Sequence, residues 1–440
     1  MPPALGEGAA TAAPSPSPKK KRKAVSEAAE DAAGEAAEGD AAEGADEEVA
    51  KAVKKPRKPK KEKVPDSVER SECPRAELAT GADRPFVALS WNVNGMRANA
   101  KDEVDMAAIR ALVEREQPDL LCLQETKLQA ANESDFNALL PGYSATFLSS
   151  TAKKGYAGVA VYVKGAKKTK VGGKGTMESF FKAKPAAAAA SHDADDGASA
   201  TAATAPEGPH GSPVVTFGIG GKGHDGIGRA VTAEYDKFYV VNLYVPNSGQ
   251  GLKAIEYRTN EWDPDLVKYV PLPPLLLLRV CCRELTRSPP PSPLPLAPPP
   301  SLRYLKKLEA GGKAVLVTGD LNVAHKDADV FNFSAPHIAK QAGCTEDERT
   351  NFDTLLGRGF VDTFRNQHAD AKAAYSFWGA RGAPKGQDLS KRDLNMGLRL
   401  DYWLVSEEYA ANVADSYILH DDLKGMSDHC PVGVAFAPPK

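Results

Sequence analysis

The stretch AVLVTGDLNVAH, which begins at residue 314, joins an apolar run directly to polar side chains. The apolar run predicts a buried β-strand. Side chains alternate between the two faces of a strand, so Asp320 and Asn322 are expected to project from the same side. Gly, Asp and Asn also end strands because they suit turns. This stretch alone therefore leaves a functional site and a plain turn equally open.

The same arrangement recurs at five other places, where a strand-like run meets Asp, Glu, Asn, Tyr or His. The side chains are Asn92 and Asn94 after FVALSW, Glu125 after DLLCLQ, Tyr244 and Asn247 in NLYVPN, Asp401 in RLDY, and Asp428 and His429 in SDHCPV. Sheets bring strand ends together at one edge, so we expect these residues to converge in one cleft. Six such strand ends are hard to explain as turns.

Helical patterns are interposed among the strand-like runs. Apolar residues recur at helical spacing between 102 and 116, namely Val104, Met106, Ile109, Leu112 and Val113. Thr345 and Glu348 form the pattern of a capping box before another helix. Many strands in hairpin-like groups, with helices between them, predict sheets that pack together under outer helices.

The composition divides the chain. Residues 1–84 are mainly Ala, Glu, Pro, Lys and Gly, with almost no large apolar side chains. They cannot bury enough surface to fold, so we predict a disordered tail followed by one domain at 85–440. Two low-complexity inserts are expected to interrupt the domain, at about 174–212 and at 271–301.

Charge and cysteine usage exclude several classes of protein. The 56 basic and 58 acidic residues nearly cancel, so net charge gives no signal for nucleic acid. The six cysteines form no CxxC pair, which is typical of a reduced intracellular protein. We expect no secretory signal and no membrane span. The tail carries a basic cluster that favours nuclear import over a merely solvated charge run, at Lys19, Lys20, Lys21, Arg22 and Lys23.

The candidate residues are carboxylates and carboxamides with one histidine and no thiolate. This set suits a hard, oxygen-seeking cation, Mg²⁺ or Mn²⁺, rather than zinc. Such a cation, a histidine and neutral donors match phosphodiester hydrolysis, in which charge grows on the phosphorane oxygens while a carboxylate prepares the water. No Ser or Cys stands in a triad pattern, which favours direct attack by water.

The motifs also resemble a known family, the exonuclease III-type apurinic/apyrimidinic (AP) endonucleases of the endonuclease/exonuclease/phosphatase superfamily. They are SWNVNGMRA, LCLQETK, GYAGVAVY, YVPNSG…EYR, GDLNVAH, RLDYWLVS and SDHCPV. The resemblance covers about residues 86–437 apart from the inserts. It implies an α/β (α+β) four-layer sandwich, with two packed, mostly antiparallel β-sheets flanked by helices. It also implies a nuclear, monomeric DNA repair enzyme of base excision repair.

The implied reaction is Mg²⁺-dependent hydrolysis of the phosphodiester 5′ to an abasic site in duplex DNA, with 3′-phosphodiesterase or 3′–5′ exonuclease side activity. The resemblance assigns catalysis to Tyr244, Asn247, Asp320, Asn322, Asp401 and His429. It assigns metal binding to Asn92, Asn94, Glu125, Asp320, Asn322, Asp428 and His429. It assigns DNA binding to Tyr156, Arg229, Phe377, Leu398 and Leu400. In relatives a Trp usually stands at the place of Leu398, so relaxed discrimination among lesions is expected.

Two other readings stay open at this point. One is another branch of the same fold, such as a non-specific DNase or a phosphoinositide phosphatase. The other is a non-catalytic DNA-binding relic, because residues 271–301 stand inside what reads as one helix. Prolines in a helix interior cost about 3 kcal/mol each, so this segment cannot continue the helix. Its Pro, Leu and Ser content suggests a retained intron, and a genuine Pro-rich loop is the alternative.

Removal of residues 271–301 tests the retained-intron hypothesis. If these residues are translated intron, the shortened chain should fold and cleave an abasic duplex, and the full chain should be inactive. Incision assays on both chains, with sequencing of the transcript, measure this. A dominant transcript that encodes all of 271–301 would refute the hypothesis.

Overall fold

The computed structural model describes residues 68–100, 102–165, 170–171, 210–220, 224–267, 304–379 and 390–439. The basic cluster at 19–23, the insert at 271–301 and residues 174–209 of the other insert lie outside these ranges, so the expectations for them stay predictions. Across the described ranges, no helix has the length and apolar character needed to cross a membrane.

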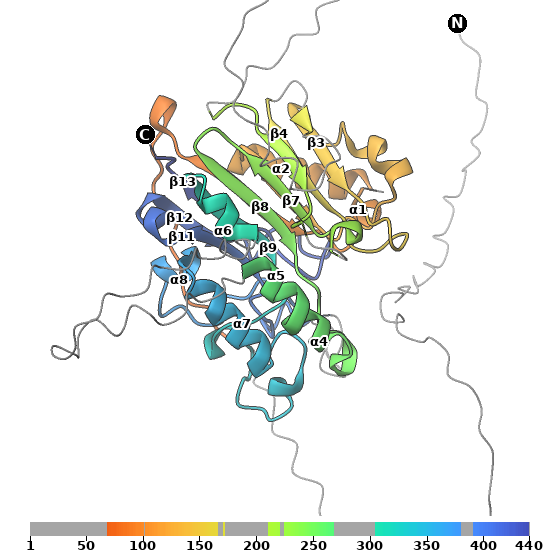
Figure 1. Ribbon diagram of the computed structural model, residues 1–440, viewed down its shortest axis with the longest axis vertical. Helices are drawn as coiled ribbons and strands as arrows, with labels where there is room; N and C mark the ends of the chain where they lie inside the picture. Colours follow the sequence, from red (N-terminus) through yellow and green to blue (C-terminus); the bar gives the residue numbers. More distant parts are fainter. Residues whose placement is uncertain are drawn as a thin grey trace, which may run out of the picture. The chain divides into compact units, whose positions relative to one another are not determined.

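Two β-sheets form the centre of the domain (Figure 1). The first has the order β12-β13-β1-β2-β4-β3, with β1 (Phe86–Asn92), β2 (Leu120–Gln124), β3 (Tyr143–Leu148), β4 (Val159–Lys164), β12 (Val413–Ile418) and β13 (Val432–Phe436). The second has the order β10-β11-β9-β8-β7-β6-β5, with β5 (Lys170–Val171), β6 (Val214–Phe217), β7 (Ala230–Glu234), β8 (Phe238–Tyr244), β9 (Ala314–Asp320), β10 (Phe360–Asp362) and β11 (Asp401–Ser406). Only β1–β2, β8–β9 and β5–β6 pair in parallel among the described strands. The prediction of mostly antiparallel sheets is confirmed.

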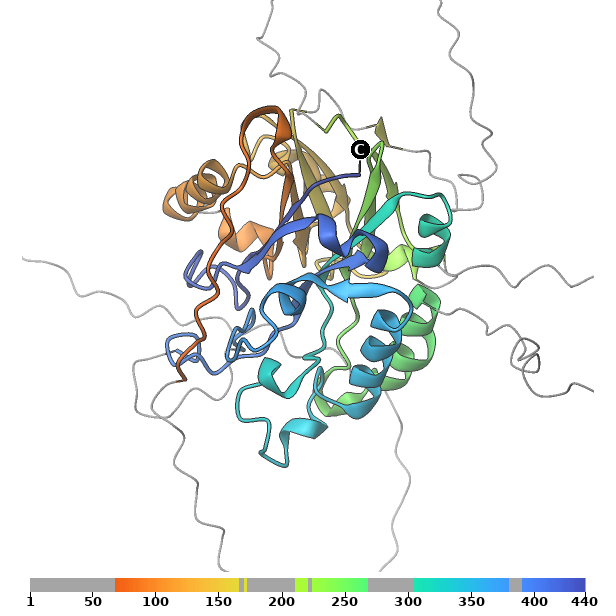
Figure 2. The ribbon, with the colours of Figure 1, turned by 90° about the vertical axis from the view of Figure 1, so that its left-hand side faces the viewer.

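Helices cover the outer face of each sheet. The first sheet is covered by α1 (Met96–Asn99) and α2 (Glu103–Glu116), and the second by α4 (Ile255–Tyr257), α5 (Asp263–Val267), α6 (Tyr304–Glu309) and α7 (Glu346–Leu356). In Figure 2 the orange α2 lies on one side of the strands, and the green and blue α5 and α7 lie on the other. A further helix, α8 (Thr363–Gln367), follows β10.

Alternating side chains in the strands build these layers. Phe238 and Val240 of β8 pack between the two sheets, whereas Tyr239 and Val241 pack against the outer helices. Each fully buried side chain of this kind contributes about 1.5–3 kcal/mol. The result is the predicted four-layer sandwich, with one apolar core between the sheets and one under each helical layer.

Helix α2 corrects one detail of the predicted apolar pattern. Met106, Ile109 and Val113 are buried, but Val104 is 75% exposed. At 3.6 residues per turn, Val104 lies on the opposite side of the helix from Met106 and Val113, so it cannot share their face. The capping box that precedes α7 is confirmed, with Thr345 as its N-cap.

Residues 68–84, the end of the predicted tail, lie against the domain (dark orange in Figure 2). The guanidinium of Arg75 stacks 3.2 Å from the centre of the Tyr417 ring, and its Nε donates to Asp415 Oδ2 at 2.6 Å. Residues 68–84 therefore contact the domain, although their composition predicts a tail. Other contacts of this segment include the ion pairs of Arg70 with Asp421 and of Arg84 with Asp119.

Strand pairing places the predicted polar side chains at one end of both sheets. β8 and β9 run in parallel, with Tyr244 opposite Asp320. β11 runs antiparallel to β9 and begins with Asp401, which is also opposite Asp320. In the first sheet, Asn92 is opposite Gln124 at the shared ends of β1 and β2. These strand ends position the candidate site.

Gly319 in β9 allows a close approach to β8, and it has φ +130°. A Cβ atom there would lie 1.9 Å from the carbonyl oxygen of Leu243. We expect Gly319→Ala to lower the free energy of unfolding by about 3 kcal/mol or more, because strain and overlap combine. Gly312→Ala is the control, because φ is +75° there but nothing lies within 4 Å of the added Cβ. We expect this substitution to lower the free energy of unfolding by only about 1 kcal/mol. Denaturant unfolding measures both, and equal losses would contradict the role of the overlap.

Candidate active site

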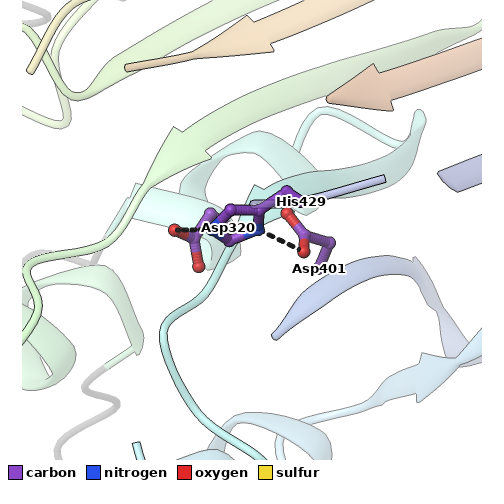
Figure 3. A group of neighbouring side chains, drawn as sticks. All are labelled: Asp320, Asp401 and His429. Carbon is purple, nitrogen blue, oxygen red and sulfur yellow. Dashed lines mark hydrogen bonds and ion pairs between the residues drawn. The ribbon is translucent and has the colours of Figure 1, made fainter. Parts of the chain in front are cut away.

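His429 lies between two buried carboxylates (Figure 3). Its Nδ1 is 2.8 Å from Asp401 Oδ2, and its Nε2 is 3.9 Å from Asp320 Oδ2. The three side chains come from the start of β11, the end of β9 and the loop before β13. Their ligating atoms all lie within 4.8 Å of one another. Residues far apart in the sequence thus form one compact acidic and histidine cluster.

The charges in this cluster are mutually dependent. Burial lowers the pKa of His429, but the carboxylates of Asp401 and Asp320 outweigh burial and raise it to about 10. Burial raises the pKa of Asp320 to about 7, against the opposing effect of His429. At neutral pH, His429 is therefore an imidazolium, and Asp320 can take up or release a proton. These are the properties of an acid–base site.

Ser376 fixes the orientation of Asp401. Its hydroxyl donates to Asp401 Oδ2 at 2.7 Å and accepts from the backbone N–H groups of Leu400 and Asp401 at 3.0 and 3.1 Å. Ser376 is fully buried. The sequence reasoning missed it, although a small polar residue next to Phe377 in an apolar segment is the kind of signal that identifies a partner for a buried carboxylate.

The carboxamide of Asn92 links the two sheets at the site. Its Nδ2 donates to Glu125 Oε1 at 3.0 Å and to Asp320 Oδ2 at 2.9 Å. Burial raises the pKa of Glu125, but the ammonium of Lys127, 3.0 Å from Oε2, and the bond from Asn92 lower it below its ordinary value. Glu125 is thus an ionised carboxylate. Tyr244 also hydrogen bonds to Glu125, and burial raises the pKa of its phenol, which stays protonated.

Asn94 and Asp428 complete this edge. Asn94 Nδ2 donates to Asp428 Oδ1 at 3.0 Å, and Lys127 Nζ donates to Asn94 Oδ1 at 2.6 Å. Lys127 was not predicted as a site residue, although it ends the quoted motif LCLQETK. Its ammonium balances the negative charge of Glu125.

Asn247 and Asn322 lie beside the carboxylate of Asp320. Asn247 Nδ2 donates to Asn322 Oδ1 at 2.7 Å. Asn322 Nδ2 donates to Asp320 Oδ2 at 3.1 Å and to the carbonyl of Val245 at 2.9 Å. The backbone N–H of Asn322 donates to Asp320 Oδ1 at 2.9 Å. Asn322 therefore orients Asp320, and Asn247 presents its carboxamide at the rim of the site.

The predicted DNA-contact residues flank the cluster in two groups. Arg229 donates to Tyr156 Oη at 2.6 Å and to the carbonyl of Tyr244 at 3.1 Å. On the other side, the ring centres of Phe377 and His429 are 4.7 Å apart. The second group continues into an apolar wall that contains Leu398 and Leu400. The structure therefore brings every predicted site residue that it describes to one edge of the sandwich.

The donors at this edge are suited to a hard divalent cation. They are oxygen atoms from the carboxylates of Glu125, Asp320 and Asp428 and from the carboxamides of Asn92 and Asn94. Cys430 follows His429 directly, but burial raises the pKa of its thiol, so no thiolate competes. Carboxylate and amide oxygens with one imidazole fit Mg²⁺ or Mn²⁺ better than zinc.

Comparison with known proteins adds independent findings. The sequence profile described as the Endonuclease/Exonuclease/phosphatase family matches residues 89–429. Recombination repair protein 1 of Drosophila melanogaster is 33% identical over 82% of this chain, and the chain spans only 38% of that protein's length. The DNA-(apurinic or apyrimidinic site) endonuclease of Dictyostelium discoideum is 31% identical over 79% of this chain and 69% of its own length. The crystal structure of AP endonuclease LMAP from Leishmania major aligns with a TM-score of 0.55 and 25% identity, over 82% of this chain and 90% of that one.

The charge of His429 can be tested directly. In metal-free protein, His429 is expected to titrate with a pKa of about 10. Asp401→Asn removes the nearer negative charge, so the pKa should fall toward the ordinary value of about 6.5. NMR titration of the imidazole resonances measures this. The control is His420, whose pKa burial lowers to about 3, and its titration should not change. An unchanged His429 titration would show that Asp401 does not hold the imidazolium.

Proposed function

This chain belongs to the endonuclease/exonuclease/phosphatase family, and on that premise we propose that it is a DNA repair endonuclease acting on abasic sites. It hydrolyses the phosphodiester 5′ to the abasic site in duplex DNA, with water as the nucleophile. The observation that carries this proposal is the buried Asp320–His429–Asp401 cluster at the shared edge of both sheets. The similarity to the Dictyostelium and Leishmania proteins, both named as AP endonucleases, supports the substrate class.

A divalent metal, Mg²⁺ or alternatively Mn²⁺, would be held by the oxygen donors at this edge. We assign Glu125, Asn92, Asn94 and Asp428 to it, with Asp320, Asn322 and His429 beside it. When bound, the metal supplies positive charge to the phosphate oxygens and leaving group. The Lys127 ammonium lies 3.0 Å from Glu125 Oε2, so the metal would bind beside this positive charge. The lowered pKa of Glu125 keeps that ligand ionised at neutral pH.

Asp320 prepares the nucleophile. It accepts a proton from the attacking water, whose oxygen forms the new bond to phosphorus while the bond to the 3′-oxygen breaks. The 3′-oxygen takes up a proton and leaves as a 3′-hydroxyl. A base with a pKa of about 7 suits this task near neutral pH. The backbone and side chain of Asn322 hold both carboxylate oxygens of Asp320 in place.

His429 stabilises the charge that develops on the phosphorane. As an imidazolium held by Asp401, it presents a fixed positive charge within a buried site, where electrostatic stabilisation is strong. Asn247 has a second amide proton beyond the one donated to Asn322, and this proton can be donated to a phosphate oxygen. Tyr244, kept protonated, lies beside the phosphate or the leaving group.

Recognition of the lesion falls to the two flanking groups. Tyr156 and Arg229 contact the DNA backbone, and the apolar wall of Phe377, Leu398 and Leu400 receives the flipped-out abasic sugar. Leucine at 398 is smaller than the tryptophan that relatives usually carry there, although Phe377 still contributes an aromatic ring to the wall. We therefore expect broader acceptance of lesions, together with 3′-phosphodiesterase or 3′–5′ exonuclease side activity.

The cellular setting is part of the same proposal. The basic cluster at 19–23 is assigned to nuclear import through the import machinery, and the enzyme acts in the nucleus as a monomer. Its macromolecular partner is damaged duplex DNA. Import of a fluorescent fusion, with and without charge removal at 19–23, tests the assignment.

Incision of a duplex with one tetrahydrofuran site tests the reaction. The wild type should cut 5′ to the lesion only with a divalent metal, and His429→Ala should lower the rate by about 10²-fold or more, because a stabilising charge is lost. An intact duplex and a phosphoinositide serve as comparison substrates. Cleavage by His429→Ala at the wild-type rate, or undiminished cleavage in a chelator, would contradict the mechanism.

A further inference from the structure

We propose that Arg258 is a positioning residue that fixes the placement of Asn247 and Asn322 for the reaction. The inference rests on the proposed function, in which these two side chains serve the phosphate and Asp320. Arg258 is the last residue of the EYR motif in the sequence. It contacts neither the cluster around His429 nor the two DNA-contact groups, so the proposed mechanism does not use it.

The guanidinium of Arg258 joins two loops that follow neighbouring parallel strands. The Arg258 side chain is 3% exposed. The residue is the first of a π-helical turn, Arg258–Trp262, between α4 and α5. Nη1 donates to the carbonyl of Pro246 at 2.9 Å and to that of Asn322 at 3.1 Å. Nη2 donates to the carbonyl of Leu321 at 2.8 Å. π-Helical turns often occur at functional sites.

These carbonyls belong to the peptide groups next to the two asparagines. Pro246 precedes Asn247 directly, and Leu321 precedes Asn322. Asn322 has φ +49°, in the left-handed region, where its backbone needs support from its surroundings. Hydrogen bonds from a charged donor are stronger than those between neutral groups, so one guanidinium can supply that support for both loops.

A second buried group holds the other end of the Asn247 loop. Glu348 is fully buried, and its Oε1 accepts from Ser248 Oγ at 2.5 Å. Its Oε2 accepts from Thr345 Oγ1 at 2.7 Å at the start of α7. Arg258 Nη1 lies 4.0 Å from Glu348 Oε1. Asn247 therefore sits between two clamped neighbours, Pro246 and Ser248, and Arg258 and Glu348 form the clamp.

The placement of Arg258 also makes the proposal open to chemical rescue. Its guanidinium lines a cavity together with Val245, Leu321 and Phe352. Truncation of the side chain leaves a space that a free guanidinium ion can enter. Asp263, which accepts from Arg258 Nε at 3.1 Å, remains there as a hydrogen-bond partner for the ion.

The first experiment compares incision of a tetrahydrofuran duplex by wild type and Arg258→Ala. We expect kcat to fall about 10²-fold, because small displacements of positioned groups have effects of this size, with KM within about 2-fold. Guanidinium chloride should restore at least about 10-fold of the loss, whereas sodium chloride at the same ionic strength should not. Equal kcat for both proteins, or equal effects of the two salts, would overturn the proposal.

Arg84→Ala provides a matched control. Arg84 is partly buried, with its side chain 24% exposed against 3% for Arg258, and it pairs with Asp119, which precedes β2 at the opposite end of the strands. Its loss removes a structural ion pair away from the site, so kcat should stay within about 2-fold of wild type. A comparable loss of kcat in Arg84→Ala would show that the effect of Arg258→Ala is general destabilisation and not loss of positioning.

A double-mutant cycle separates positioning from stability. In an Asn247→Ala background, Arg258→Ala should lower kcat by much less than 10²-fold, because part of what it positions is already gone. A full additional loss would overturn the proposal. Ser248→Ala removes the hydrogen bond to Glu348 without removing a charge, and it should lower kcat by about 10-fold. If Arg258→Ala does not fold, this variant tests whether the clamp positions Asn247. Failure to incise by both the full chain and the chain that lacks 271–301 would instead refute the proposed function itself.

Discussion

One imidazolium between two buried carboxylates is the interaction on which the site depends. Transfer of charges from water into the interior is costly, and each charge here is tolerated only because the others compensate it. His429 stays positively charged because the carboxylates of Asp401 and Asp320 lie next to it. Asp320 stays partly ionised because the positive charge of His429 favours its carboxylate form. Removal of His429 would leave the two buried carboxylates of Asp320 and Asp401 without a compensating charge.

The sandwich architecture makes this cluster possible. Parallel pairing of β1 with β2 and of β8 with β9 brings carboxyl ends to the same edge of each sheet. The carboxamide of Asn92 then connects the two edges by donating to Glu125 and Asp320. The apolar core between the sheets sets their separation, so packing far from the site determines whether these hydrogen bonds can form.

Residues 268–303, outside the ranges that the structure describes, come directly after α5. Leu266 of α5 and Tyr304 of α6, on either side of this segment, are both buried in the same outer layer. The two helices on either side of residues 268–303 therefore belong to the same layer.

The sequence alone determined the layers and the identity of most site residues, because period-two apolar runs and their polar ends are local patterns. It identified Asp401 and His429 as candidate residues, because each stands where a strand-like run meets a polar side chain. It did not reveal the contacts of Ser376, Lys127 or Arg258, and it placed Val104 on the buried face. Those properties depend on which segments meet across the two sheets and at what distance. Hydrogen bonds and shifts in pKa arise from such contacts, so only the tertiary structure decided them.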